Sequence, residues 1–387
     1  MTRHEEWIEK LAGFDTLSAL QASEFFIRHR EQIQSYFRTP QFHFYHGAAP
    51  RLSSFLRIAQ WNIEKGKRFN RILDHFQNNE ILKWADVIVL NEADYGMIRS
   101  CNRHVARELA EHLGMHMVFG PAHFELTKGT ADDLEVAGRN RESIQGNAIL
   151  SRYPITDAVL VPLPVSFEPY EFEEKRFGAR SCLWGRIEFK HARLWVGSVH
   201  LELRNTPRCR ASQVKHILDN LPDEEGSACI LGGDLNTNGF ARGTAWRTVK
   251  SALRILYRSP EQLKTQLLHP EKGREPLFEI ARLKGFLWEH LNSNVETART
   301  AIDALEESDR LPGFLTRFVR QRLQPYHGYL CFKLDWFLGR HVHPLQDMQR
   351  RDVSGVPSRS PGCVEGVNYG PDRLSDHLPI YADVDLC

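Results

Sequence analysis

The ten residues Phe55-Leu-Arg-Ile-Ala-Gln-Trp-Asn-Ile-Glu64 show a pattern that the rest of the chain repeats. Apolar and polar residues alternate as in a β-strand, and the run ends on Asn62 and Glu64. A polar side chain at the end of a buried strand is costly unless it is paired, exposed at a rim or bound to a metal. One such residue is most often a surface residue or a cap, so the prediction depends on whether other strands end in the same way.

Several further apolar runs lead to polar residues of the same kinds. The residues that lie within or directly beside these runs are Glu92, His200, Asp234, Asn236, Asp335, Asp376 and His377. If the strand ends meet at one rim of the fold, these side chains form a pocket rich in carboxylates. Oxygen ligands of this type suit Mg²⁺ or Mn²⁺ rather than zinc.

Predicted strands alternate with predicted helices along the chain. After the first strand we expect a helix over 71–84 and strands over 87–90, 147–151, 183–189, 194–201, 229–234, 334–338 and 378–384. Many short strands with helices between them predict two packed sheets flanked by helices.

Two regions interrupt this pattern. Residues 1–50 are predicted to form an N-terminal helical extension, because apolar residues recur at helical spacing until Gly47 and Pro50 break the pattern. The main domain is expected over 51–387, with a mostly helical insertion at about 240–326 and a long loop over 347–374. The basic segment 310–322 is interpreted as an amphipathic helix packed on the domain, with nucleic acid or an anionic lipid surface as the alternative partner.

The composition restricts the classes of function. Among 387 residues, 50 are basic and 49 acidic, so the net charge of +1 argues against binding nucleic acid through bulk charge. The sequence has no apolar run that fits a signal peptide or a transmembrane helix. Its seven cysteines are dispersed, which favours reduced thiols and a cytoplasmic location. No obligate protein partner is evident.

Seven ordered segments carry a resemblance to a known family. They are Ala59–Glu64, Leu90–Ala93, Gly146–Arg152, Val199–Glu202, Gly232–Asn236, Leu334–Leu338 and Ser375–Ile380. Together they resemble the motifs of the endonuclease/exonuclease/phosphatase superfamily, in the order that the family has them. The resemblance spans about Leu52 to the last residue. It implies an α+β fold, a four-layer α/β/β/α sandwich of two mixed β-sheets flanked by helices, with Mg²⁺ or Mn²⁺ as cofactor.

The same resemblance implies a metal site and a catalytic group. Glu92 is similar to the family's main metal ligand, and further ligands or phosphate contacts are expected at Asn62, Glu64 and Asp376. The catalytic residues implied are His200, Asp234, Asn236, Asp335 and His377. Asp234 would orient or deprotonate the attacking water, and Asn236 would hold that water or a phosphate oxygen. Asp335 would fix the imidazole of His377, and His200 lies where the deoxyribonuclease and sphingomyelinase branches have a catalytic His.

Three further residues are predicted to contact the substrate: Asn147, Arg180 and Arg204. Arg204 lies in an Arg-rich segment and Arg180 follows Arg176 closely, and guanidinium groups bind phosphate through a planar fork. The alternative for both segments is a solvated loop without a ligand.

These expectations describe a divalent-metal-dependent hydrolase of phosphate esters, preferably a phosphodiesterase, that acts by in-line attack of water. The substrate stays open between nucleic acid, phospholipid and a phosphorylated small molecule, because one fold of this kind hosts several activities. The alternative is a catalytically inactive binding or scaffold protein that retains the fold.

Overall fold

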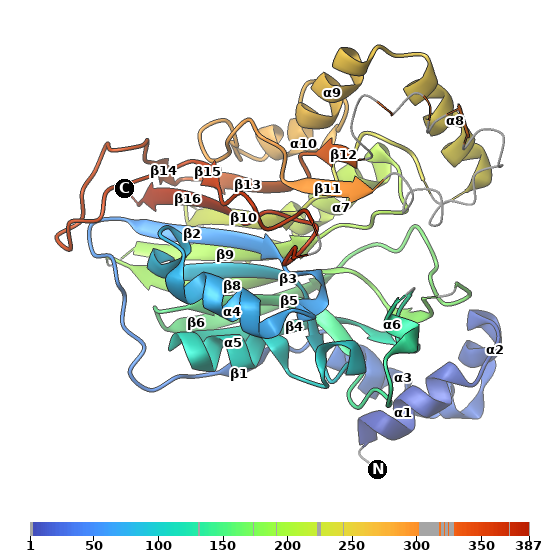
Figure 1. The fold of residues 1–387 in the computed structure, drawn as a ribbon. Coiled ribbons are helices and arrows are strands. Elements are labelled where there is room, and N and C mark those ends of the chain that lie inside the picture. The colour runs from blue at the N-terminus through green and yellow to red at the C-terminus, as the bar shows by residue number, and fades with distance from the viewer. Residues whose placement is uncertain are drawn as a thin grey trace.

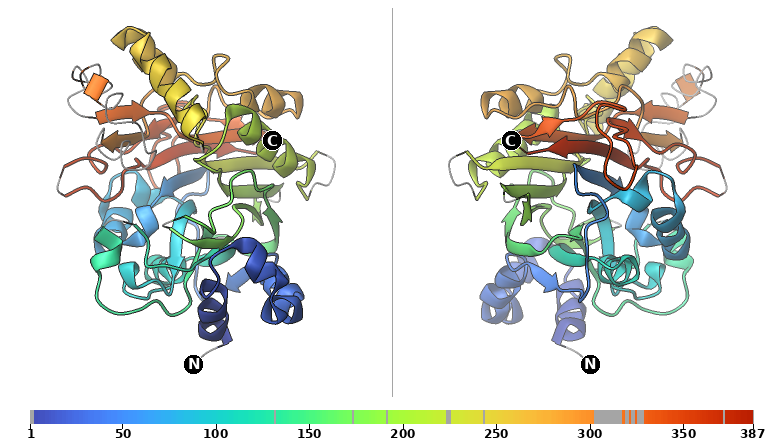
Figure 2. Two further views of the ribbon diagram at one scale, coloured as in Figure 1. Left: turned by 90° about the vertical axis from the view of Figure 1, so that its right-hand side faces the viewer. Right: turned by 90° about the vertical axis from the view of Figure 1, so that its left-hand side faces the viewer.

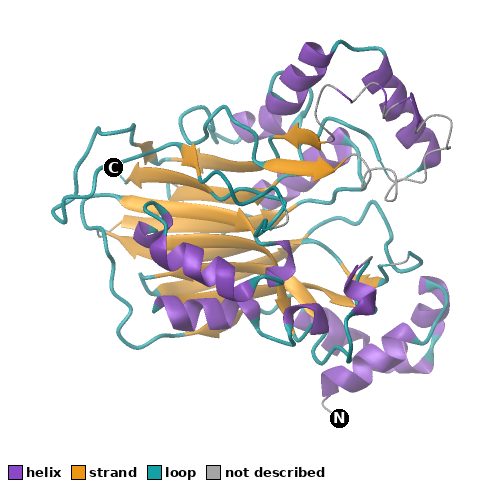
Figure 3. Cartoon of the chain, in the orientation of Figure 1, coloured by secondary structure: helices purple, strands orange, loops and turns teal. Residues whose placement is uncertain are grey.

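The computed structural model describes residues 3–130, 132–172, 174–190, 192–222, 226–242, 244–301, 317–318, 321, 324, 329–370 and 372–386. Its strands gather in the centre of the molecule with helices around them, as Figure 3 shows. Two large sheets account for most of these strands, and a separate pair is formed by β11 (Ala298–Ala301) and β12 (Tyr329–Phe332).

Sheet A contains the first and the last long strands of the domain. Its described strands are β1 (Gln41–His43), β2 (Leu56–Asn62), β3 (Val87–Tyr95), β4 (His116–Glu125), β5 (Ile144–Ser151), β7 (Arg176–Gly178), β14 (His343–Pro344), β15 (Gly362–Cys363) and β16 (Ile380–Asp385). The order is β1-β4-β5-β3-β2-β16-β14, with β7 paired to β4 and β15 to β16. The pair β2–β3 is parallel, whereas β2 and β16 are antiparallel, so the sheet is mixed.

Sheet B is formed by the middle of the chain. Its described strands are β6 (Ile155–Pro162), β8 (Ser181–Phe189), β9 (Ala192–His200), β10 (Ala228–Asp234) and β13 (Asp335–Arg340). They follow the order β13-β10-β9-β8-β6, and the pair β9–β10 is parallel while the others are antiparallel.

Three apolar clusters hold the layers together. One lies between the sheets and contains Ile58 and Val89 of sheet A with Val196 and Ile230 of sheet B. A second packs α4 (Phe69–Asn78) and α5 (Val105–Leu113) on the outer face of sheet A. The third packs α7 (Pro207–Asp219) and α10 (Leu277–Leu283) on sheet B. The predicted α+β fold, a four-layer α/β/β/α sandwich of two mixed sheets, is therefore confirmed, and its layers can be followed in Figure 1.

The N-terminal region contains the helices α1 (Arg3–Ala12), α2 (Leu17–Ala22) and α3 (Glu24–Tyr36). They project beyond the sheets at one end of the molecule in both views of Figure 2. Their apolar residues Trp7, Leu11 and Ile33 are nevertheless buried in the cluster that covers sheet A. The division at residue 50 stays a prediction, although β1 already pairs with β4 at the edge of sheet A.

Short helices connect the layers. They are η1 (Glu64–Gly66), η2 (Leu82–Trp84), η3 (Ile98–Ser100) and α6 (Asp132–Glu135). The single helix predicted over 71–84 is wrong in extent, because α4 ends at Asn78 and the side chain of Asn79 caps the next turn. Its Oδ1 accepts hydrogen bonds from the N–H groups of Ile81 and Leu82.

The region predicted as a helical insertion contains α8 (Ala245–Leu256) and α9 (Pro260–Leu268) before α10. The basic segment 310–322 lies outside the described residues except for 317, 318 and 321. None of the helices in the described ranges is both long and apolar enough to cross a membrane.

Candidate active site

The polar residues that end β2, β9 and β10 and the one that begins β13 meet at one rim, because each continues the face that its strand turns toward the other sheet. In β2, Ile58 packs between the sheets whereas Ala59 packs under the helices, so Asn62 belongs to the inner face. Asn62 is in register with Asn91 of β3. On the opposite sheet, Asp234 of β10 is in register with His200 of β9 on one side and Asp335 of β13 on the other.

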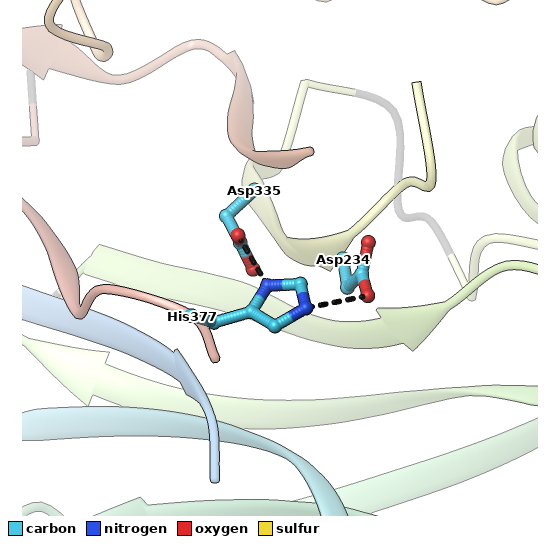
Figure 4. A group of neighbouring side chains, drawn as sticks. All are labelled: Asp234, Asp335 and His377. Carbon is cyan, nitrogen blue, oxygen red and sulfur yellow. Dashed lines mark hydrogen bonds and ion pairs between the residues drawn. The ribbon is translucent and has the colours of Figure 1, made fainter. Parts of the chain in front are cut away.

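His377 joins two carboxylates of sheet B, as Figure 4 shows. Its Nδ1 lies 2.7 Å from Asp335 Oδ2, and its Nε2 lies 3.7 Å from Asp234 Oδ2. All three side chains are buried. The backbone that carries the imidazole is fixed as well, because Trp61 Nε1 donates to the His377 carbonyl over 3.0 Å and Ser375 Oγ accepts from the His377 N–H.

The protonation of this group follows from its surroundings. Burial opposes a charge on His377, but Asp335, Asp234 and Asp376 outweigh burial and raise its pKa well above 6.5. The imidazole is then a cation that donates from both nitrogens. Burial raises the pKa of Asp234 to about 7; His377 opposes this rise and Asp335 adds to it. Asp234 can therefore exchange a proton near neutral pH.

His200 has the opposite protonation state. Burial lowers its pKa well below 6.5, and Arg180 and His377 lower it further. Its Nδ1 lies 2.8 Å from Arg180 Nη1. A guanidinium can only donate, so Nδ1 accepts and Nε2 carries the proton of the neutral ring. Because Nε2 lies 3.4 Å from Asp234 Oδ2, His200 presents a hydrogen-bond donor beside that carboxylate.

Glu92 has an unusual backbone conformation. It lies in a β-bulge between Leu90 and Ala93 with φ of +56°, a region that non-glycine residues rarely occupy. Asn62 Nδ2 donates to its carboxylate over a long 3.4 Å. Burial opposes ionisation, but Lys65, Arg180 and His377 outweigh it and lower the pKa of Glu92 below its usual value. Glu92 is thus a charged carboxylate with weak contacts, one to Asn62 and one to His200 Nδ1 over 3.8 Å.

Glu64 is more strongly held. Arg373 Nη2 donates to its Oε1 over 2.8 Å, and Arg68 Nη1 lies 3.5 Å from its Oε2. Burial and the nearby Asp376 raise the pKa of Glu64, while Arg373 opposes this rise. Ser375 Oγ lies 3.4 Å from Asp376 Oδ1 and donates to the Asn62 carbonyl over 2.6 Å, which links Asp376 to the end of β2.

Two groups of side chains could accept a divalent cation. The ligand atoms of Asp234, Asp335 and His377 lie within 4.8 Å of one another. A protonated imidazole bound to Asp335 has no lone pair to offer, so this trio fits a hydrogen-bonded group better than a metal site. Glu92 offers a charged oxygen with a weak contact, next to the amide of Asn62. Such hard oxygen donors fit Mg²⁺ or Mn²⁺.

Asn147, predicted to contact substrate, and Asn236, predicted to be catalytic, are both held by hydrogen bonds within the protein. Asn147 is buried, accepts from Asn91 Nδ2 over 3.0 Å and donates to the Ser181 carbonyl over 2.8 Å, so both ends of its amide are used. Asn236 donates from Nδ2 to the Leu201 carbonyl over 2.8 Å, and its N–H donates to Asp234 Oδ1 over 2.9 Å.

The two predicted arginines are placed differently from each other. Arg180 reaches His200 directly. The guanidinium of Arg204 lies over two aromatic rings, with its Cζ 5.6 Å from the ring centre of Phe167 and 5.2 Å from that of Phe172. Arg180 therefore belongs to the rim, whereas the contacts of Arg204 are with these two rings.

Sequence reasoning missed a buried polar group beneath the rim. Gln60 Nε2 donates to both Asn91 Oδ1 and Asp335 Oδ1 over 3.1 Å, which links the two sheets. Asn91 Nδ2 also donates to Ser198 Oγ over 3.3 Å. The sequence contains a sign of this buried group. Gln60 and Ser198 lie two positions before Asn62 and His200, so each shares the strand face of that site residue.

The comparisons with known proteins identify a family. The model of the Endonuclease/Exonuclease/phosphatase family matches residues 59–377. A search of curated proteins finds no match.

Solved structures resemble the chain at low identity. One is an endonuclease/exonuclease/phosphatase from Beutenbergia cavernae, 17% identical, with a TM-score of 0.48 over 86% of this chain and 72% of that one. Another is the human Nocturnin catalytic domain, 14% identical, with a TM-score of 0.45 over 90% of this chain and 97% of that one. A third is a family protein from Leptotrichia buccalis, 13% identical, with a TM-score of 0.47 over 86% and 100%.

These structural matches are too distant to carry an argument about function. The family model covers most of the chain, including the strands that bring Asn62, Asp234 and His377 together. The chain belongs to the endonuclease/exonuclease/phosphatase family.

Proposed function

We propose that this protein hydrolyses phosphate esters, preferably phosphodiesters, with the help of a divalent cation. The observation that carries the proposal is the position of Asp234, whose Oδ2 lies 3.7 Å from His377 Nε2 and 3.4 Å from His200 Nε2. The imidazole of His377 is charged and that of His200 is neutral. Both face the carboxylate of Asp234, whose pKa lies near neutral pH. Metal-dependent hydrolysis of phosphoesters is the general activity of this family, which agrees with that arrangement.

In this proposal Asp234 accepts a proton from the attacking water and orients it for in-line attack. A base with a pKa near neutrality suits this task, because it is partly deprotonated at working pH and still basic enough to accept a proton. Asp335 holds His377 through Nδ1, so that the charged imidazole stabilises negative charge on the phosphoryl group. His200, oriented by Arg180, supplies a neutral N–H donor on the other side of Asp234.

The cation is assigned to Glu92, with Asn62 and Asp376 as further contacts and Glu64 as the weakest candidate. A bound Mg²⁺ or Mn²⁺ would neutralise charge on a phosphoryl oxygen. The charged, weakly bonded carboxylate of Glu92 supports this assignment. Glu64 already binds Arg373 and Arg68, so its role is the positioning of Arg373 rather than direct coordination.

The contacts of the predicted substrate-binding residues suggest different roles for them. Arg180 keeps a substrate role in the proposal, and Arg204 is a contact at the approach to the site. Asn147 is proposed to support Asn91 and the rim rather than to touch substrate. A cytoplasmic location remains part of the proposal.

A substrate panel tests the proposal on the wild type beside Asp234→Asn, with Mg²⁺, Mn²⁺ or EDTA. The panel contains double- and single-stranded DNA, RNA, sphingomyelin, inositol polyphosphates and bis(p-nitrophenyl) phosphate. We expect metal-dependent hydrolysis of at least one member that Asp234→Asn loses. If no member is hydrolysed and calorimetry detects no bound cation, the protein is a binding or scaffold protein with this fold.

A further inference from the structure

A cavity with polar and apolar walls adjoins the proposed catalytic group. It lies beside β7, between the segment 163–169 and the start of β8, and is lined by residues that include His123, Phe167, Arg176, Arg180, Glu202 and Gln213. Arg180 belongs to both places, because its Nη1 contacts His200 while its side chain lines this cavity. Arg180 could therefore contact both a group at the catalytic rim and a group in the cavity.

Several polar atoms in the walls lack a hydrogen-bond partner among the described residues: His123 Nε2, Arg176 Nε, Arg180 Nε and Gln213 Oε1. His123 and Gln213 are only 3% exposed. A buried polar atom without a partner is energetically unfavourable, so native proteins seldom leave several of them together. Among these atoms, the Nε–H groups of Arg176 and Arg180 can donate to an anion, whereas Gln213 Oε1 can only accept and needs a donor group of the ligand.

The charges around the cavity select the kind of ligand. Arg176 and Arg180 bring two positive charges, and Glu202, 3.9 Å from Arg180 Nε, brings one negative charge. Burial lowers the pKa of His123 far below 6.5, and Arg176 and Arg180 contribute, so this imidazole is neutral and adds no charge. The lining is therefore positive overall, with guanidinium groups that match the geometry of phosphate oxygens.

The shape of the cavity restricts the ligand further. Its inner wall is formed by the buried His123 and Gln213, whereas Val165 and Ser166 lie exposed at its outer side. Phe167 adds an apolar wall, and Arg204 lies over the same ring. Such a cavity suits the end of a small molecule better than the middle of a polymer.

We propose that this cavity binds a second anionic group, a terminal phosphate, on a small phosphoester whose scissile bond lies at the Asp234 rim. The proposal rests on the proposed function in calling the bound molecule a substrate. The preferred substrates are then phosphorylated small molecules with two phosphate groups, and Arg180 is shared between the two phosphates.

Binding without metal tests the cavity itself. Calorimetry compares thymidine 3′,5′-bisphosphate with thymidine 5′-monophosphate on the full chain in EDTA. We expect the bisphosphate to bind at least roughly tenfold more tightly, as charged hydrogen bonds would provide. We call this difference in affinity the bisphosphate advantage. Ser166→Trp, which places a large ring at the outer side of the cavity, should abolish the bisphosphate advantage, while Ser166→Ala should keep it. Equal binding of both nucleotides, or an advantage that survives Ser166→Trp, would overturn the proposal.

A second variant and a second ligand complete the test. Arg176→Met should reduce the bisphosphate advantage as Ser166→Trp does, and circular dichroism checks that it folds. An oligothymidylate without terminal phosphates should bind Ser166→Trp and wild type equally. If Ser166→Trp weakens the oligonucleotide as much as the bisphosphate, the cavity accepts internal phosphates of a strand and the assignment to a terminal phosphate is wrong.

Hydrolysis of bis(p-nitrophenyl) phosphate, which has no second anion, separates this proposal from the proposed function. If wild type hydrolyses it with Mg²⁺ but shows no bisphosphate advantage, the function stands and the cavity proposal fails. If the bisphosphate advantage is present and neither this diester nor any member of the panel is hydrolysed, the cavity binds anions as proposed and the catalytic proposal fails.

Discussion

Buried charges are arranged differently at the two ends of the neighbouring strands β2 and β16. The near end is the one beside the candidate active site, and the far end is the opposite one. At the far end, Arg57 and Asp383 face each other in register and form two hydrogen bonds, Nε to Oδ1 over 2.7 Å and Nη2 to Oδ2 over 2.8 Å. The Arg359 N–H adds a third donor to Asp383 over 2.7 Å. Each charge there has an opposite partner.

At the near end, carboxylates outnumber the cations between them. His377 lies between Asp335 and Asp234, with Asp376 next to it in the chain. These carboxylates raise the pKa of His377, and burial together with Asp335 raises that of Asp234, whereas the charge pair at the other end stabilises the fold. Crowded titratable groups at one end and paired charges at the other are the contrast expected between a site of chemistry and a structural contact.

The largest expected effect is on catalysis at the near end. Asp234→Asn keeps the shape of the side chain but cannot accept a proton, so kcat on the validated substrate should fall by about 10²–10⁴-fold. Near-normal turnover would mean that Asp234 is not the base. Asp383→Asn is the matched control, since it makes the same chemical change at the far end and should retain activity at temperatures where it stays folded.

For stability, we expect the larger effect at the far end of the strands. Asp383→Asn leaves the buried Arg57 without its charge partner, so the free energy of unfolding should fall by about 3–5 kcal/mol in urea denaturation. Asp234→Asn removes a carboxylate whose ionisation is opposed by burial and by Asp335, and it should destabilise the protein less. Equal losses in the two variants would remove the distinction between the two ends.

At the near end, Glu92 and Glu64 should contribute unequally to the affinity for Mg²⁺. Glu92→Gln removes the charged oxygen and should raise the Mg²⁺ concentration for half-maximal activity about tenfold or more. Glu64→Gln should have a smaller effect, because the Glu64 oxygens are engaged by Arg373 and Arg68. Calorimetric titration with Mg²⁺ measures both, and an unchanged affinity in Glu92→Gln would exclude it as a ligand.

The smallest expected effect concerns Glu125 at the end of β4. Burial raises its pKa to about 8, Glu174 adds to this, and Arg99 opposes it. The carboxyl of Glu125 therefore binds its proton more tightly in the folded state than in the unfolded state. Its contribution to the stability of the fold is largest below its unfolded pKa and is lost as pH rises toward 8. Glu125→Gln should remove that dependence, so the variant gains stability relative to wild type between pH 5 and 8. Parallel pH profiles of the two proteins would contradict the raised pKa.

Much of the fold followed from local patterns. The strands β3 and β10 lie where their short apolar runs predicted them, although β3 extends to Tyr95, beyond the predicted 87–90. The strand β4 was not predicted, although it is ten residues long, because its segment includes Gly120, Pro121 and His123, which interrupt the apolar pattern. Only its place between β1 and β5, buried on both faces, makes it a strand.

The sequence alone determined which residue types stand at the ends of the strands, and with them the family and the predicted metal preference. It could do so because strand periodicity and the order of motifs are local properties of the chain. The tertiary structure decided how those residues work. The charge on His377, the neutral state of His200 and the cavity between His123 and Gln213 all arise from groups far apart in the sequence. Burial and charge–charge interactions depend on distance in space, which local sequence patterns do not specify.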